Sequence, residues 1–357
     1  EAQAARWACA LRNAASGLPL AAEVARPRRF LVLINPNSGQ SKSASVWRQT
    51  KPILEASGAE ISVVETTHAN HSAEIAATLD ETKVDAILCV SGDGLIHEVV
   101  NGLMSRADAQ FVIQNIAIGA IPAGSANSLS TSVLKAAAEP NNAASAAFLI
   151  AKGRSTKLDL WKVTQEGGKS GYAFLSLEWA MASDIDLGSE AWRWMGELRF
   201  DLYAAWRLIT QWRYEGELRY KRHGDQGWQT VDGTFLMVWA VNMKWMTNDC
   251  QLAPQAAFDD GTADLLYIQK ARKLSMIGEF LDLSTGKHVE APWMAYEKVV
   301  AFELDPRVRT PKKPGMIAVD GELWPYAKTL VEVLPSTLSL LGVGEAADVV
   351  DMAVART

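Results

Sequence analysis

The sequence contains few of the features that mark secreted, membrane-spanning or metal-binding proteins. Among its 357 residues are only three cysteines, Cys9, Cys89 and Cys250, which are far apart and odd in number. Cysteines with this spacing form neither a disulfide framework nor a metal site, so we expect a reducing environment. The five histidines add no metal signature, because no cysteine or histidine pair lies near His68 and His71.

Long apolar runs and an excess of basic residues are also missing. No run approaches the roughly 18 apolar residues that indicate a membrane-spanning helix. The first 28 residues lack the apolar centre of a secretory signal, and we interpret residues 1–27 as an N-terminal extension of helix and linker. The net charge of −6 argues against nucleic acid as a partner.

The rest of the composition is that of a globular protein. Hydrophobic residues make up 48% of the chain and charged residues 21%, enough for one large domain or two ordinary ones. The sequence also has thirteen tryptophans and ten methionines, which are concentrated in its second half. The two halves of the chain therefore differ in composition.

The first half alternates short β-rich runs with helical patterns. We predict strands over 30–34, 61–65, 85–90 and 115–121, with helices over 44–56, 72–79 and 95–104 and another after the fourth strand. Alternation of this kind predicts a parallel sheet, and continuously apolar strands indicate that helices cover both of its faces.

The pattern changes near residue 155 and becomes mostly β. A hairpin is predicted from 157–163 and 172–180, and a helix over 193–212; further strands are predicted over 216–223, 234–242, 264–269, 298–304, 316–323 and 328–334. The predicted fold class is a doubly wound α/β nucleotide-binding domain followed by a mostly antiparallel β-sandwich. We assign them to residues 28–155 and 156–345, with a tail over 346–357.

Three loops at the strand ends share one chemistry. They are Asn35 to Gly39, Ser91 to Gly94, and Pro122 to Asn127, and each is rich in Gly, Ser or Asn and precedes a helix. Ligands of open parallel sheets bind beyond the carboxyl ends of the strands, where small residues and helix amino ends suit anions. One such loop is explained equally well by a tight turn, but three at one edge favour a phosphate site.

Named nucleotide motifs do not account for these loops. No G-x-G-x-x-G follows the first strand, and Gly168-Lys169-Ser170 lacks the earlier glycine of a P-loop, because that position is Val163. Asp93 would repel a phosphate unless it binds Mg²⁺ or takes a proton from an attacking hydroxyl. The alternative is an N-cap, in which Asp93 bonds the first amides of its helix.

Four motifs, in order, resemble the diacylglycerol kinase catalytic-domain superfamily, and within it the sphingosine kinases. SGDGLIHEVVNGLM is similar to the family's signature, and IPAGSANSLS to its Pro-Ala-Gly-Ser/Thr-Gly-Asn loop. SDIDLGSEAWRWMGELRF resembles its lipid-recognition segment, and AVDGEL its C-terminal element. The resemblance covers roughly residues 28 to 345.

The resemblance implies that Asp93 is the base that deprotonates a lipid hydroxyl. The nucleotide-binding residues that it implies are Asn35, Pro36, Asn37, Ser38, Gly39, Thr66, Gly92, Gly94, Glu98, Gly124, Ser125, Ala126, Arg193, Arg199, Asp320, Gly321 and Glu322. Arg193 and Arg199 are six residues apart, so they reach one ligand only if the chain bends between them, which Gly196 allows. For each arginine the alternative is a surface ion pair, and for VDGE it is an Asp-Gly hairpin turn.

Four residues are expected on the acceptor side: Ser91, Asp93, Ser176 and Asp186. The resemblance places an acid at Asp186 in kinases of sphingoid bases. A sphingoid base carries an ammonium beside its primary hydroxyl, and a buried carboxylate pairs with that cation. Ceramide and diacylglycerol have no such cation. The alternatives are that Asp186 is exposed on a polar loop, or that the nearby Asp184 takes this role.

Bulky apolar residues of the second half have two interpretations. They line a tunnel for an alkyl chain or belong to an ordinary sandwich core; these residues are Leu198, Phe200, Leu202, Trp206, Ile209, Trp212 and Met276. Three residues depart from the family pattern. They are Gln40 and Ala126 in the phosphate loops, and Glu178, an acid in a segment that is normally apolar or small.

The predicted activity is transfer of the γ-phosphate of ATP to the primary hydroxyl of sphingosine or a related long-chain base. Mg²⁺ is expected to bind together with the nucleotide. Rival hypotheses are a diacylglycerol or ceramide kinase, a catalytically weakened lipid- or nucleotide-binding homologue, and a sugar or NAD kinase. We expect a cytoplasmic protein that associates peripherally with membranes. A homodimer is left open.

Overall fold

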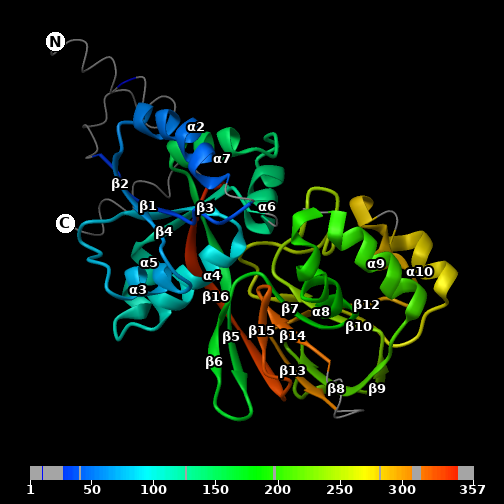
Figure 1. The fold of residues 1–357 in the computed structure, drawn as a ribbon. Helices are drawn as coiled ribbons and strands as arrows, with labels where there is room; N and C mark the ends of the chain where they lie inside the picture. Colours follow the sequence, from blue (N-terminus) through cyan, green and yellow to red (C-terminus); the bar gives the residue numbers. More distant parts are fainter. Residues whose placement is uncertain are drawn as a thin grey trace, which may run out of the picture. The chain divides into compact units, whose positions relative to one another are not determined.

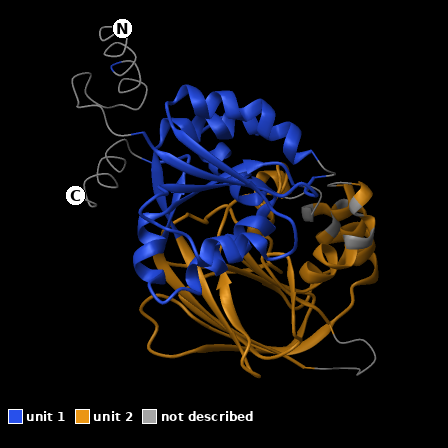
Figure 2. Ribbon diagram, turned by 60° about the vertical axis from the view of Figure 1, so that its left-hand side comes forward, with its two compact units in different colours: residues 1–158, 337–357 blue, residues 159–336 orange. Residues whose placement is uncertain are grey.

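The computed structural model describes residue 10 and residues 27–39, 42–124, 127–195, 198–280, 283–307 and 315–344. The chain divides into two compact units, coloured separately in Figure 2: residues 1–158 with 337–357 (unit 1), and residues 159–336 (unit 2). Strands β5 (Ser155–Gln165) and β16 (Thr329–Leu341) each have one end in each unit. The units therefore divide the chain at residues other than the predicted 28–155 and 156–345.

Unit 1 contains the predicted parallel sheet. Its strands pair in the order β2-β1-β3-β4, namely Glu60–Glu65, Arg29–Ile34, Ala86–Ser91 and Ala117–Pro122. The end of β16 adds a parallel pairing to β4 through Ser339 and Leu340. β3 is buried along its whole length, and β1 in all but its first residue. Apolar side chains on both faces of these strands require helices on both sides.

The helices of unit 1 cover both faces of this sheet (Figure 1). They are α2 (Ser43–Ala56), α3 (His71–Ala77), α4 (Asp93–Met104), α5 (Ala109–Asn115), α6 (Ser128–Ala136) and α7 (Ala143–Lys152). α2 packs against α7, and α3 against α4. The second contact needs a glycine, because a Cβ on Gly102 would lie 2.3 Å from the carbonyl oxygen of Ala73.

Unit 2 is built from antiparallel sheets. One has the order β12-β11-β10-β7-β14-β15: Ala295–Val299, Ala263–Ile268, Met237–Val241, Ser176–Ala180, Ile317–Val319 and Glu322–Trp324. In the other, β16 is followed by β13 (Ala301–Pro306), β8 (Tyr214–Lys221) and β9 (Gln229–Phe235), and β5 pairs with β16 and with β6 (Ser170–Ala173).

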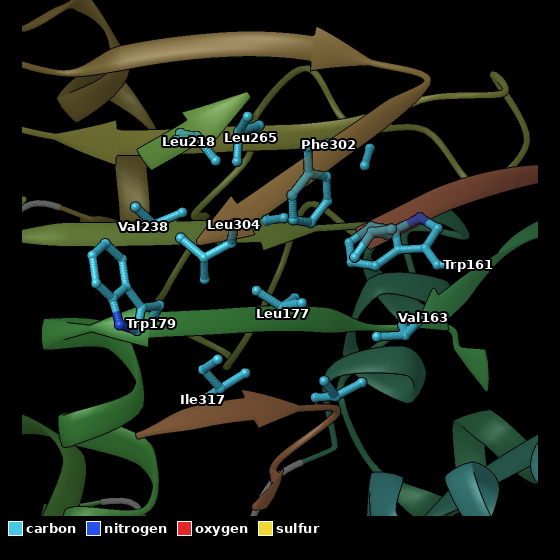
Figure 3. Packing of buried hydrophobic residues seen from close by; sticks show 14 of the residues in the cluster. Trp161, Val163, Leu177, Trp179, Leu218, Val238, Leu265, Phe302, Leu304 and Ile317 are labelled. Carbon is cyan, nitrogen blue, oxygen red and sulfur yellow. The ribbon is translucent and has the colours of Figure 1, made fainter. Parts of the chain in front are cut away.

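Side chains from both sheets fill the core of unit 2 (Figure 3). Trp179 and Val238 come from the first sheet, and Trp161, Leu218 and Phe302 from the second, and all five have less than 1% of their surface exposed. Burial of each large apolar side chain contributes roughly 1.5–3 kcal/mol. The predicted fold class, an α/β domain followed by a β-sandwich, is confirmed.

Several predicted elements of unit 2 are wrong. The strands over 234–242 and 298–304 each divide between two sheets, into β9 and β10 and into β12 and β13, and the strand over 316–323 is the hairpin of β14 and β15. The single helix over 193–212 is two helices, η1 (Gly188–Met195) and α9 (Leu198–Thr210). The strand over 172–180 is also divided, because β6 and β7 belong to different sheets. The break falls at Phe174 and Leu175, whose N–H groups donate to the Asp320 carboxylate rather than to a neighbouring strand. The other helical segments are α8 (Met181–Asp186), α10 (Lys273–Phe280), η2 (Leu283–Thr285) and η3 (Lys287–Glu290).

A buried ion pair joins α8 to α9. Arg207 is fully buried, and its Nη2 and Nε atoms lie 2.5 and 3.0 Å from Asp184 Oδ2. The Tyr214 hydroxyl donates to the same oxygen at 2.6 Å, and the guanidinium lies 4.2 Å from the centre of the Trp212 ring. Burial raises the pKa of Asp184, and the charge of Arg207 opposes that shift. The cation therefore offsets part of the cost of burying the carboxylate.

Arg207→Met should destabilise unit 2 strongly, because it leaves the Asp184 carboxylate buried without its cation. Removing one partner of a buried pair costs about 3–5 kcal/mol. Urea denaturation followed by circular dichroism measures this loss. The double variant Arg207→Met with Asp184→Asn should be less destabilised than Arg207→Met alone. Equal stability of Arg207→Met and wild type would contradict the assignment.

Candidate active site

The three glycine-rich loops leave the carboxyl ends of β1, β3 and β4, at one edge of the parallel sheet. At this edge the Ala123 N–H donates to the Ser91 carbonyl oxygen at 3.0 Å, which joins the second and third loops. The first loop is a turn in which Asn35 accepts hydrogen bonds from the N–H groups of Ser38 and Asn37. The structure thus brings the three loops together.

Gly39 packs directly against the third loop. Its φ of +53° is in the left-handed region, and a Cβ at this position would lie 1.9 Å from the carbonyl oxygen of Ala123. Any side chain at residue 39 would force the first and third loops apart. The glycine therefore sets how closely the two backbones approach each other.

Asp93 is the first residue of α4, and only 6% of its surface is exposed. Its carboxylate accepts hydrogen bonds from the N–H groups of Ser128 at 2.7 Å and Leu129 at 3.2 Å, the first two residues of α6. Asp93 thus caps another helix rather than its own, where Gly92 is the N-cap without a side-chain hydrogen bond. These two bonds fix the orientation of the Asp93 carboxylate.

The third loop is held by Asn127. Its Oδ1 accepts from the Gly124 N–H at 3.0 Å, and its Nδ2 donates to the Gly124 carbonyl at 2.9 Å. Ser125 and Ala126, two predicted nucleotide-binding residues, lie outside the described residues, as does Gln40.

Two further predicted residues of unit 1 already have partners. The Thr66 N–H donates to the Ile34 carbonyl at 2.8 Å, and its side chain is buried. Glu98, on α4, accepts a hydrogen bond from the hydroxyl of Ser72, on α3. The Thr66 hydroxyl also donates to the Ile34 carbonyl, at 3.4 Å. The roles of both residues at a nucleotide stay predictions.

On the side of unit 2, Asp320 and Gly321 form the turn between β14 and β15. Their φ angles of +51° and +81° fit a two-residue hairpin turn, the predicted alternative for this motif. The Asp320 carboxylate accepts N–H hydrogen bonds from Phe174, Leu175 and Ser176 at 2.9–3.0 Å. The turn is thereby fixed to the start of β7.

The predicted acceptor residues Ser176 and Asp186 lie with this turn in unit 2, and Glu178 joins them. A Cβ on Gly321 would lie 3.5 Å from Asp186 Oδ2, and the Ser176 hydroxyl donates to Glu178 Oε1 at 3.1 Å. The pKa of Glu178 is well above its ordinary value, because of its burial first and then the charges of Asp186 and Asp320. The other predicted acceptor residues, Ser91 and Asp93, belong to unit 1.

The two arginines lie on separate helices, η1 and α9. Arg199 is buried near the start of α9, with its guanidinium 4.3 Å from the centre of the Phe200 ring. Arg193 lies in η1, and its side chain is outside the described part of the chain. Their contact with phosphate stays a prediction.

Family models match both parts of the chain. The diacylglycerol kinase catalytic domain matches residues 29–163, and the YegS C-terminal NAD kinase beta sandwich-like domain matches residues 183–342. Among solved structures, a diacylglycerol kinase from Bacillus anthracis str. Sterne is similar, with a TM-score of 0.61 and 17% identity over 88% of this chain and 97% of that one. At this identity, the likeness shows the fold alone.

Curated relatives are more similar in sequence. Sphingosine kinase 1 of Arabidopsis thaliana is 34% identical over 84% of this chain and 69% of its own length. The chain belongs to the sphingosine kinase family, and it is a lipid kinase. Sphingosine kinase 1 of Homo sapiens is 30% identical, over 84% of this chain and 86% of its own. Sphingoid long chain base kinase 4 of Schizosaccharomyces pombe is 31% identical, over 87% and 74%.

Two contacts of this sphingosine kinase family member were not predicted from its sequence. The amides of Ser128 and Leu129 hold Asp93, and those at residues 174–176 hold Asp320. Backbone amides carry no residue identity, so no motif signals them. Glu178 was noted as a departure from the family, but its place beside Ser176 and Asp186 follows only from the packing of β7, α8 and the β14–β15 turn.

Gly39→Ala should weaken ATP binding by about five- to thirtyfold, because the left-handed conformation costs alanine about 1–2 kcal/mol and tenfold corresponds to 1.4 kcal/mol. Titration with an ATP analogue measures this change. Gly227→Ala is the matched control, since a Cβ there meets no atom within 4 Å. Unchanged affinity in Gly39→Ala would show that the first loop does not contact the nucleotide.

Proposed function

We propose that the protein transfers the γ-phosphate of ATP to the primary hydroxyl of sphingosine or a related sphingoid long-chain base. The observation that carries this proposal is the Asp93 carboxylate, held by two amides of α6 among three loops suited to phosphate. The names of the relatives support the acceptor, because they are sphingosine kinases and a sphingoid long chain base kinase.

In this proposal Asp93 takes the proton of the acceptor hydroxyl as the oxygen attacks the γ-phosphate. Phosphoryl transfer depends mainly on positioning and on stabilising the charge that develops. The fixed orientation of the Asp93 carboxylate serves the first need. The amides of the glycine-rich loops, together with Arg193 and Arg199, are proposed to serve the second.

Recognition of the acceptor is assigned to unit 2, through Asp186. Asp184 was the rival for this role, but its carboxylate already pairs with Arg207 and Tyr214. Asp186 lies beside the β14–β15 turn with Ser176 nearby, and we assign to it the ammonium of the base. Ceramide and diacylglycerol bring no cation to this carboxylate, which favours a sphingoid base.

Magnesium is proposed to enter with the nucleotide. Within the described part of the chain, no group of three or more His, Cys, Asp or Glu side chains is placed to hold a metal ion alone. Mg²⁺ in kinases is held by one or two carboxylates together with substrate phosphates, so this donor set fits an ion carried by ATP. Its chemistry would be to neutralise charge on the phosphates during transfer.

We also propose that the protein meets its substrate at a membrane surface. Among the described residues, no helix is long and apolar enough to cross a membrane. However, α9 exposes Leu198, Leu202, Trp206 and Ile209, with 40–62% of each side chain accessible. The first three repeat every fourth residue and so share one helix face. This exposure argues against a buried sandwich core and favours peripheral association.

Asp93→Asn should abolish transfer of labelled phosphate from ATP to sphingosine. A positioned base contributes about 10²–10⁴-fold to the rate, so kcat should fall by that factor. Circular dichroism must show that the variant is folded, since Asp93 also caps α6. A variant that is folded and keeps most of its kcat would exclude Asp93 as the base.

Asp186→Asn should raise KM for sphingosine by about tenfold or more, because hydrogen bonds to charged groups contribute about 1.5–3 kcal/mol. The assay compares sphingosine, ceramide and diacylglycerol as acceptors. Asp249→Asn, at an exposed loop position of the same unit, is the control for loss of an acid. If wild type binds ATP but labels none of the three lipids, the non-catalytic hypothesis is favoured instead.

A further inference from the structure

Glu178 is a buried acid that the proposed chemistry does not use. Only 3% of its surface is exposed, and its Oε1 accepts a hydrogen bond from Ser176. Its Oε2 is shielded from solvent and has no hydrogen-bond partner in the described structure. A buried polar atom without a partner is unfavourable, so its presence calls for an explanation.

The strand beside Glu178 offers no hydrogen bond of normal geometry. Trp239 is the paired residue on β10, and its indole N–H is near enough to affect the carboxyl. Both Trp239 Nε1 and Glu178 Oε2 nevertheless remain without hydrogen-bond partners. The second carboxyl oxygen therefore has unused acceptor capacity.

The groups that face Glu178 from the neighbouring elements are acidic. Asp186 faces it from the end of α8, and Asp320 from the β14–β15 turn, while β10 contributes Trp239, which does not titrate. Burial and these two charges raise the pKa of Glu178 well above its ordinary value. In the free protein the carboxyl therefore holds its proton at higher pH than an exposed glutamate.

A ligand that reaches Glu178 Oε2 also meets the charge of Asp186, and a metal ion does not fit there. No His, Cys, Asp or Glu group of the described chain has the arrangement of a metal site. An ammonium suits it better, because it carries one positive charge and three N–H donors. One donor pairs with Asp186, and another reaches Glu178 Oε2.

We propose that Glu178 is a specificity-determining residue, the second carboxyl group of the ammonium site, and that it releases its proton when a cationic base binds. The inference rests on the proposed function, since it takes the sphingoid ammonium as the ligand. No covalent bond changes. One proton passes from Glu178 to solvent for each base bound, and the carboxylate that forms accepts a hydrogen bond from the ammonium.

The proposal fixes the sign of a pH effect. Binding that releases a proton strengthens as the pH rises through the range where free Glu178 is still protonated. A neutral lipid releases no proton from Glu178, so its affinity does not rise with pH in this way. Loss of the proton from the amine itself at high pH weakens binding equally with or without Glu178, so a comparison of variants isolates the effect of this residue.

The test is calorimetric titration of wild type and Glu178→Gln with a short-chain, water-soluble 2-amino-1,3-diol. Titrations near neutral pH in two buffers of different ionisation enthalpy count the protons released. Wild type should release protons when the base binds, and Glu178→Gln should release none. In the kinase assay, KM of Glu178→Gln for the base should exceed the wild-type KM by about tenfold at the upper end of a range from about pH 6 to pH 8, and by less at the lower end, with kcat unchanged.

Two controls separate recognition from folding. Glu178→Ala should also release no proton. Glu178→Gln keeps the side-chain volume and an acceptor for the Ser176 hydroxyl, so its melting temperature should not fall. Glu297→Gln, on β12, should behave as wild type. The diol without an amine should show no proton release with any variant.

Each negative result leads to a different conclusion. If wild type phosphorylates sphingosine but Glu178→Gln releases the same protons with the same KM, the inference is wrong and the proposed function stands. If the Glu178 variants melt lower and lose affinity equally for the base and the neutral diol, Glu178 has a structural role only. If wild type labels no sphingoid base, the proposed function fails.

Discussion

The hydrogen bonds from the amino end of α6 to Asp93 hold together the edge of unit 1 that carries the candidate active site. The first amides of a helix have no partners within the helix, and a carboxylate satisfies two of them here. Because Asp93 starts α4, these bonds tie the loop after β3 to the helix after β4. The close contact of Gly39 with Ala123 then adds the loop after β1. One side chain thus links the loops after β3 and β4 and is itself held in a fixed orientation.

Unit 2 repeats this device with Asp320. Its carboxylate takes three amides at the point where the chain leaves β6 and enters β7. That exchange ends one strand and starts another in a different sheet. It also places Ser176 and Glu178 on β7 beside the turn that contains Gly321. In both units, backbone amides gathered around an acid determine where the candidate site residues stand.

Much of the fold could be predicted from the sequence, because the signals were local. Strand β3 is continuously apolar, which indicates a strand buried on both faces, and the parallel order places the loop ends at one edge. The break near Phe174 could not be predicted, since it depends on a carboxylate far along the chain. The choice between Asp184 and Asp186 was equally open. It depends on Arg207, which lies 23 residues beyond Asp184 and folds back onto it.

Four buried carboxylates in the described part of the chain follow one rule, and a fifth departs from it. Asp93 and Asp320 are satisfied by amides, Asp184 by Arg207 and Tyr214, and Asp159 by the amides of Gly261 and Ser336. Each of these acids stabilises a junction of the fold, because its partners come from another segment. Glu178 alone among these five has an oxygen without a hydrogen-bond partner in the described structure. A buried acid is stable when the fold supplies hydrogen-bond donors to its oxygens. Glu178 has no such donor at Oε2, and for this reason we assign it to a ligand.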